Sequence, residues 1–324
     1  MDGVAPFFIE EALFLLNNRK SAEQLSADWG IIAEQLNSKQ PAAVCISIHR
    51  SDDAEFPFKQ LFRFDPPELW QFAAEHNWNL PHYAINEVEI NDCSSSPVGF
   101  LTFPLLGDSG PRRMLQLDER NTLILCKMVA NSPLPVSLVL TNLVQVHPSL
   151  DPIINASRIA TVNYRSSSRG HKFSRVDLVK TMLDRKTLSA LILSSNVEWM
   201  VSDQAMRHLV EFVSSGRFEL LDFVAHYDSD VDFFEMAETF LDVLVQCKRN
   251  KVVTIKNSSR KTQMIEYLEG MNMFTKRSCG ASATFFSEHL RIDIVGFLQA
   301  TERETLYQTG ALEENRIVIH CKDA

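Results

Sequence analysis

Leu188-Ser-Ala-Leu-Ile-Leu-Ser-Ser-Asn196 is the stretch that indicates the expected fold most clearly. Residues 189–193 are expected to form a strand, because a short run of leucine and isoleucine between serines is typical of buried strands. Similar strands are expected over residues 159–164, 220–225 and 252–255. Their centres lie about 30 residues apart, which is the length of a helix–strand unit in a repeat protein.

The segments between these strands have the features of helices. Residues 203–213 end just before Gly216, and residues 232–247 begin at Asp232, with Glu235 in the position of a capping box. A third helix is expected over residues 261–268, and late strands over 283–286, 290–295 and 316–320. Helical crossovers allow neighbouring strands to run parallel. We therefore expect an α/β fold in which residues 157–324 form a largely parallel sheet with helices on its outer side.

Residues 157–324 resemble leucine-rich repeats of the longer kind. Leu188, Leu191, Leu193 and Asn196 match the repeat consensus, whereas the other units are degenerate. An ordinary α/β domain with right-handed crossovers is the alternative for this region.

The preceding region, residues 41–156, is expected to be an irregular α/β region. Strands are predicted over residues 44–48, 85–90 and 136–140, and helices over 68–76 and 121–129. Residues 91–113 are rich in serine, proline and glycine and are interpreted as loops.

Composition and charge limit the function. The 324 residues are 45% hydrophobic and 23% charged, which is ordinary for a globular protein. The 32 basic and 41 acidic residues give a net charge of −9, which argues against nucleic-acid binding. The six cysteines form no CxxC pair, so we expect reduced thiols and a cytoplasmic or nuclear protein. We expect neither a signal peptide nor a membrane partner, because no apolar run approaches the roughly 20 residues of a membrane span.

Two sequence patterns suggest chemistry but do not meet its requirements. Cys279, His289 and Asp293 could supply a nucleophile, a base and an orienting carboxylate, but no local signature surrounds the cysteine. Residues 228–232 resemble the start of a calcium loop, but Phe233 and Thr239 occupy the places of the required Gly and Glu. We therefore predict no catalytic residue, no cofactor and no metal site.

The first 40 residues have the apolar spacing of a helical hairpin. One stripe repeats at i, i+4 and i+7, and a second helix, expected to start at Ser21, repeats at i, i+4, i+7 and i+11. The first stripe is Ile9, Leu13 and Leu16, and the second is Leu25, Trp29, Ile32 and Leu36. So small a hairpin must bury part of its apolar surface on something else.

This hairpin resembles an F-box. Val4-Ala5-Pro6 corresponds to the opening of that motif, and Leu25-Ser26, Trp29 and Ile32-Ala33 to its closing pattern. Ala5 separates the usual apolar–proline pair, Asp28 replaces a common basic residue, and the link between Pro6 and Trp29 is short. The resemblance implies that the hairpin binds the adaptor subunit of a cullin–RING ubiquitin ligase, while the C-terminal region selects an unknown protein substrate without catalysis. The residues implied in adaptor binding are Pro6, Ile9, Leu13, Leu16, Leu25, Trp29 and Ile32.

Two alternatives to the ligase function remain. The chain could be a leucine-rich-repeat-like scaffold with no ligase link, in which the hairpin caps the first repeat. It could also be an enzyme whose site gathers Cys279 with a histidine and a carboxylate. The scaffold alternative predicts that the Trp29 stripe is buried on the chain's own sheet.

Overall fold

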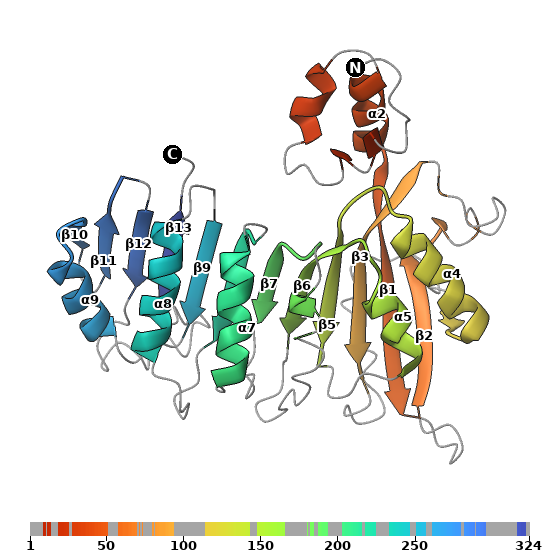
Figure 1. Cartoon of the computed structure of the whole chain (residues 1–324). Coiled ribbons are helices and arrows are strands. Elements are labelled where there is room, and N and C mark those ends of the chain that lie inside the picture. Colours follow the sequence, from red (N-terminus) through yellow and green to blue (C-terminus); the bar gives the residue numbers. More distant parts are fainter. Residues whose placement is uncertain are drawn as a thin grey trace. The chain divides into compact units, whose positions relative to one another are not determined.

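Helices and strands alternate along the chain in the computed structural model, so the protein belongs to the α/β class (Figure 1). The chain forms two units, Met1–Thr161 and Val162–Ala324, which divide inside strand β6 (Ile159–Arg165). The sequence places boundaries at 40/41 and 156/157, and the second lies close to this division. The structure describes residues 9–10, 12–13, 19–25, 28–50, 58–69, 71, 73, 80, 82–93, 114–142, 148–165, 180, 182–184, 187–193, 203–215, 218–224, 233–246, 251–256, 261–279, 282–288, 290–295 and 316–321.

The first unit begins with short helical segments. Residues 9–10 and 12–13 are helical, and they are followed by the 3-10 helix η1 (Arg19–Gln24) and the α-helix α2 (Asp28–Asn37). The expectation of one continuous helix from Ser21 is therefore wrong. The chain turns at Leu25, whose N–H donates to the Ala22 carbonyl at 3.1 Å. Leu25 consequently lies outside the helix that carries Trp29.

A mixed sheet follows in the same unit, with the strand order β5-β3-β1-β2-β4. Its strands are β1 (Gln40–Arg50), β2 (Phe58–Asp65), β3 (Tyr83–Asp92), β4 (Leu115–Gln116) and β5 (Val136–Thr141). β1 and β3 pair parallel, as do β3 and β5, whereas β2 pairs antiparallel with both β1 and β4. The strands expected near 46, 88 and 138 are confirmed. β2 was not expected, although Phe62 and Phe64 are buried on either side of Arg63 in the alternation of a half-buried strand.

Helices of the first unit pack beside this sheet. They are α4 (Glu119–Ala130), η2 (Pro148–Leu150) and α5 (Asp151–Ile154). α4 starts at the N-cap Asp118, whose carboxylate accepts the Asn121 N–H at 2.7 Å, and it buries Leu125 and Val129. The helix expected over residues 121–129 is therefore confirmed. Of the helix expected over 68–76, residue 68 lies in a turn, residues 69, 71 and 73 are helical, and the others lie outside the described residues.

The second unit contains a sheet with the strand order β10-β11-β12-β13-β9-β8-β7. Its first three strands alternate with helices: β7 (Ala190–Leu193), α7 (Asp203–Ser214), β8 (Leu220–Val224), α8 (Phe233–Val245), β9 (Lys251–Lys256) and α9 (Lys261–Gly270). β7 pairs parallel with β8, and β8 with β9. This part of the expected parallel sheet is confirmed.

The last strands correct the expectation of a largely parallel sheet. They are β10 (Thr275–Cys279), which was not expected, β11 (Ser282–Phe286), β12 (Leu290–Val295) and β13 (Arg316–Cys321). All their pairings are antiparallel, including that of β13 with β9. Short connections join β10 to β11 and β11 to β12, and a parallel crossover needs a dozen or more residues.

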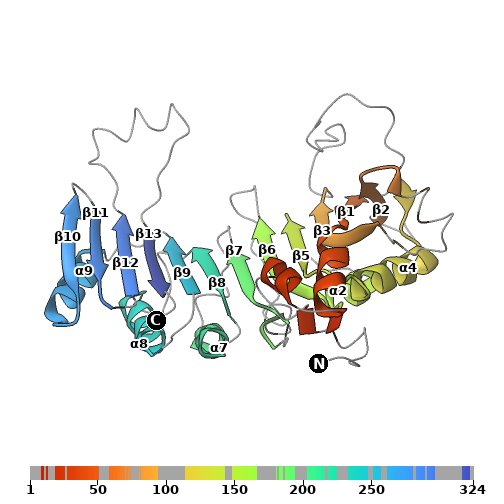
Figure 2. The same cartoon turned by 90° about the horizontal axis from the view of Figure 1, so that it is seen from above.

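The two faces of this second sheet differ. Helices α7, α8 and α9 lie on the same face in both views (Figures 1 and 2). On that face Phe223 of β8 meets Phe240 of α8 edge-on, with ring centroids 6.0 Å apart, and both side chains are fully buried. No helix of the described residues covers the opposite face (Figure 2).

Candidate functional site

The N-terminal helical segments of residues 9–37, for which the name hairpin is kept, share a hydrophobic core. This core consists of Ile9, Leu13, Ala22, Ile32, Ala33 and Leu36, and the partly buried Trp29 packs against it. Within the part of the chain that the structure describes, all members of this core come from residues 9–36, and none comes from the sheet. The helical segments of residues 9–37 therefore pack mainly on one another.

The same hairpin exposes large apolar side chains. Leu25 is 50% exposed and Ile31 is 56% exposed. They flank Trp29 in the sequence, and the Trp29 indole N–H is buried without a hydrogen-bond partner among the described residues. Exposed apolar groups around a tryptophan are typical of a protein-binding surface.

A close contact of main chains fixes the shape of the hairpin. A Cβ atom on Gly30 would lie 2.6 Å from the carbonyl oxygen of Leu25 and 3.0 Å from that of Glu23. A Cβ contact shorter than 3.0 Å, such as the one with Leu25, is essentially never seen in real proteins. Gly30 therefore allows α2 to pack directly on the turn at the end of η1.

The residues implied in adaptor binding fall into three groups. Ile9, Leu13 and Ile32 are buried in the hairpin core, so in this structure they shape the hairpin and do not form its surface. Leu25 is half exposed and Trp29 is partly buried, and their contact with an adaptor stays a prediction. Pro6 and Leu16 lie outside the described residues. Ile31 was not expected at the binding surface, because a helical stripe that includes Ile32 excludes its neighbour.

A second candidate surface lies on β10 to β13, on the face that carries no described helix. We name it the arginine face and define it by Arg277, Thr284, Phe286, Arg291, Asp293 and His320. Thr284 lies opposite both Arg277 and Asp293 in the sheet, and Arg291 lies opposite both Phe286 and His320. Directly opposed residues share a face, so these six side chains form two neighbouring rows.

Asp293 is the electrostatic centre of the arginine face. Its carboxylate accepts a hydrogen bond from Thr284 Oγ1 at 2.8 Å and lies 2.9 Å from Arg291 Nε. His320 Nε2 is 3.6 Å from the same carboxylate. Asp293 therefore orients side chains of the neighbouring strands. The trio of Cys279, His289 and Asp293 is not tested by the structure, because His289 and the side chain of Cys279 lie outside the described residues.

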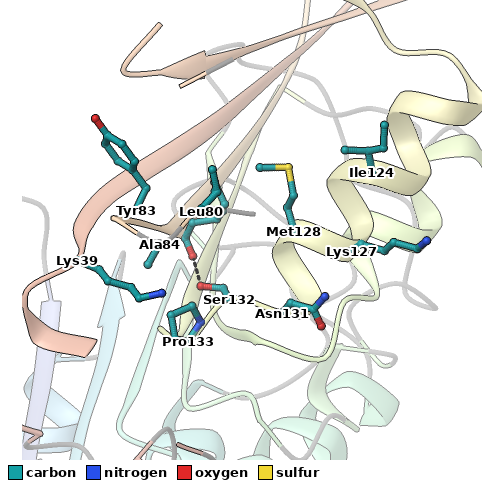
Figure 3. A pocket seen from close by; sticks show the side chains of 11 residues that line it. Lys39, Leu80, Tyr83, Ala84, Ile124, Lys127, Met128, Asn131, Ser132 and Pro133 are labelled. Atoms are coloured by element: carbon teal, nitrogen blue, oxygen red, sulfur yellow. Dashed lines mark hydrogen bonds between the residues drawn. The ribbon is translucent and has the colours of Figure 1, made fainter. Parts of the chain in front are cut away.

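A pocket of about 440 Å³ opens in the first unit, at the amino ends of β1 and β3 and the carboxyl end of α4 (Figure 3). Apolar side chains make most of its wall: Leu80, Ala84, Ile85, Ile124, Met128 and Pro133. Its charged residues are Lys39 and Lys127, and cations are favoured near the carboxyl end of a helix. The described residues of the lining include no His, Cys, Asp or Glu, and so no pair of the kind that activates a nucleophile.

Thiols of the first unit are poor nucleophiles. Burial raises the pKa of Cys45 to about 11, and the neighbouring Glu89 carboxylate adds to the increase. Burial also raises the pKa of Cys93 and of Cys126. A thiol must lose its proton to react, so these three cysteines are protected at neutral pH.

This shift predicts an alkaline weakening of the first unit. The pKa of Cys45 is higher in the folded state than its ordinary value of 9.0, so its stabilising effect is complete below pH 9 and is lost as the pH rises toward about 11. Two pKa units correspond to about 3 kcal/mol at most. Urea unfolding should show that the free energy of unfolding falls less between pH 8 and pH 10.5 in Cys45→Ala than in the wild type. An equal fall in the two proteins would contradict the prediction.

Comparison of the chain with protein-family models, with curated proteins and with solved structures found no match. Within the described residues, no cluster of His, Cys, Asp or Glu is placed to hold a metal ion. The described helices include none with the length and apolar character needed to cross a membrane. The Asp228–Asp232 segment, which resembles a calcium loop, lies outside the described residues.

Proposed function

We propose that this chain is an F-box-like substrate-recognition adaptor of a cullin–RING ubiquitin ligase. The hairpin binds the adaptor subunit of the ligase, and the second unit binds the protein to be modified. The observation that carries this proposal is that the hairpin packs around its own core and still exposes Leu25 and Ile31 beside Trp29. A helical module with these features can bind in a groove of another protein.

The second unit supports the substrate-binding part of the proposal. Its parallel strands β7, β8 and β9 alternate with helices that lie on one face, as in a leucine-rich-repeat-like arrangement. No described helix covers the opposite face, and repeat proteins commonly bind partners on such a surface. In this function the chain itself catalyses no covalent step, and it works in the cytoplasm or nucleus.

The scaffold alternative differs in what the hairpin packs against. A hairpin that only caps the first repeat would bury its apolar stripe on the sheet. Trp29 instead packs on the hairpin core, whose members all lie between Ile9 and Leu36. This separation favours a hairpin that binds a partner.

Charge substitutions in the hairpin test the proposal. Leu25→Asp combined with Ile31→Asp should weaken binding of the purified adaptor subunit by about thirtyfold or more, because central apolar contacts commonly contribute about 2 kcal/mol or more. Binding is measured by calorimetric titration of the full chain. Thermal melting should change little, because both side chains are already at the surface.

Leu123→Asp is the matched control. Leu123 is 54% exposed but lies on α4, away from the hairpin sequence. This variant should bind the adaptor subunit like the wild type. If the wild type itself does not bind the adaptor subunit, the ligase function is wrong and the scaffold alternative is preferred.

A further inference from the structure

The arginine face contains an aromatic ring with two guanidinium groups beside it. The guanidinium carbon of Arg277 lies 5.2 Å from the centroid of the Phe286 ring, and that of Arg291 lies 6.0 Å from it. Both distances are within the range of cation–π attraction. The three side chains come from β10, β11 and β12, so cross-strand pairing alone brings them together.

These arginines are positioned differently. Arg291 is held by Asp293, to which its Nε atom lies at 2.9 Å, and 47% of its side chain remains exposed. Arg277 is also exposed, and its guanidinium is paired with no carboxylate among the described residues. The face therefore has one oriented cation and one cation that is available to an anion.

We propose that the arginine face binds an extended acidic segment of a partner protein. An apolar side chain of the segment packs over Phe286, and carboxylates on both sides of it bind Arg277 and Arg291. Alternate side chains of an extended strand point the same way and are spaced by about 7 Å, which suits two guanidinium groups beside a single ring. The inference rests on the proposed function in one respect, because the segment would belong to the protein that the ligase selects.

Charge complementarity favours a protein partner over a nucleic acid. Asp293 lies in the middle of the arginine face, 2.9 Å from Arg291 Nε. A continuous row of phosphates would meet this carboxylate, whereas two separate carboxylates can avoid it. A short acidic peptide is therefore the occupant that fits this surface.

A fluorescein-labelled peptide with the core Glu-Ser-Leu-Ser-Glu serves as the probe. The full wild-type chain should bind it in fluorescence anisotropy at low salt, and higher salt should weaken binding because the contacts are exposed. Arg277→Gln should lower the affinity by about tenfold, since it removes a charge-assisted contact. The same peptide with Gln in place of both Glu residues should bind the wild type more weakly than the acidic peptide binds Arg277→Gln, because it loses both charge-assisted contacts.

Lys276→Gln is the matched control on the same strand. Lys276 lies next to Arg277 but contacts Glu269 and the Phe285 ring, on the face that carries the helices. It should change the affinity by less than about twofold. Equal losses in Lys276→Gln and Arg277→Gln, or no binding of the peptide by the wild type, would overturn the inference. Tighter binding of a labelled single-stranded oligonucleotide, competed only weakly by the peptide, would overturn it as well.

The measurement is independent of the ligase. No adaptor subunit is present, and the Leu25→Asp, Ile31→Asp variant should bind the peptide like the wild type. A chain that binds the peptide but not the adaptor subunit disproves the proposed function alone. A chain that binds the adaptor subunit but not the peptide disproves this inference alone.

Discussion

Gly30→Ala is expected to unfold the N-terminal hairpin while the sheets stay folded. Alanine normally stabilises a helix relative to glycine, by about 1 kcal/mol. Here the added methyl group would meet the Leu25 carbonyl at 2.6 Å, and main-chain atoms cannot move aside as a flexible side chain can. Overpacking of this kind costs about 1–3 kcal/mol or more, which is large for a small core whose described members lie between Ile9 and Leu36.

Hydrogen exchange read by mass spectrometry can locate this effect. Amides of α2 should exchange much faster in Gly30→Ala than in the wild type, while those of β1, β3 and β8 keep their protection. Binding of the adaptor subunit should be lost together with the hairpin. Unchanged exchange in α2 would show that the hairpin adapts to the extra methyl group.

Gly270→Ala is the control for the glycine change. Gly270 is the last residue of α9, and a Cβ atom there would meet nothing within 4 Å. This substitution should be neutral or slightly stabilising, by up to about 1 kcal/mol. The change in stability is expected to have opposite signs at Gly30 and Gly270. This difference separates a steric clash from the general effect of replacing glycine in a helix.

Phe223→Ala is expected to destabilise the second unit by about 3–5 kcal/mol. Phe223 is fully buried in β8, which pairs with β7 and β9, and its ring meets that of Phe240. Its loss leaves a cavity between the sheet and α8. Urea unfolding should show a lower midpoint for the second unit.

Met273→Ala is the control for this large-to-small change. Met273 lies in the same unit and is 42% exposed, so its truncation should cost less than about 1 kcal/mol. Similar shifts of the urea midpoint in Phe223→Ala and Met273→Ala would mean that Phe223 does not stabilise the core. The adaptor titration should be unaffected by either variant, because the hairpin core contains neither residue.

Local sequence patterns predicted most of the regular elements. The strands β7, β8 and β9 and the helices between them follow from short apolar runs, caps and spacing, which depend on neighbouring residues only. The same reasoning failed where the signal was mixed. β2 alternates phenylalanines with Lys59 and Arg63, and β10 is a short edge strand with Lys276 and Arg277 in its middle.

Strand direction was only partly predictable. Helical connections of about 30 residues indicated the parallel pairing of β7, β8 and β9 correctly. The connections after β10 and β11 are short and therefore favour antiparallel hairpins. The expectation of parallel strands was wrong there because it extended the helix–strand pattern of β7, β8 and β9 to the last strands. The pairing of β13 with β9 joins strands some 60 residues apart, and no local pattern indicates it.

By itself the sequence determined which residues of the hairpin are apolar and at what spacing they repeat. It could not tell whether these residues pack on one another, on a sheet or on a partner, because periodicity defines a face and not what covers it. Only the tertiary structure placed Ile9, Leu13 and Ile32 in a common core and left Leu25 and Ile31 at the surface. The arginine face likewise exists only through cross-strand register, since Arg277, Phe286 and Arg291 meet when three strands pair.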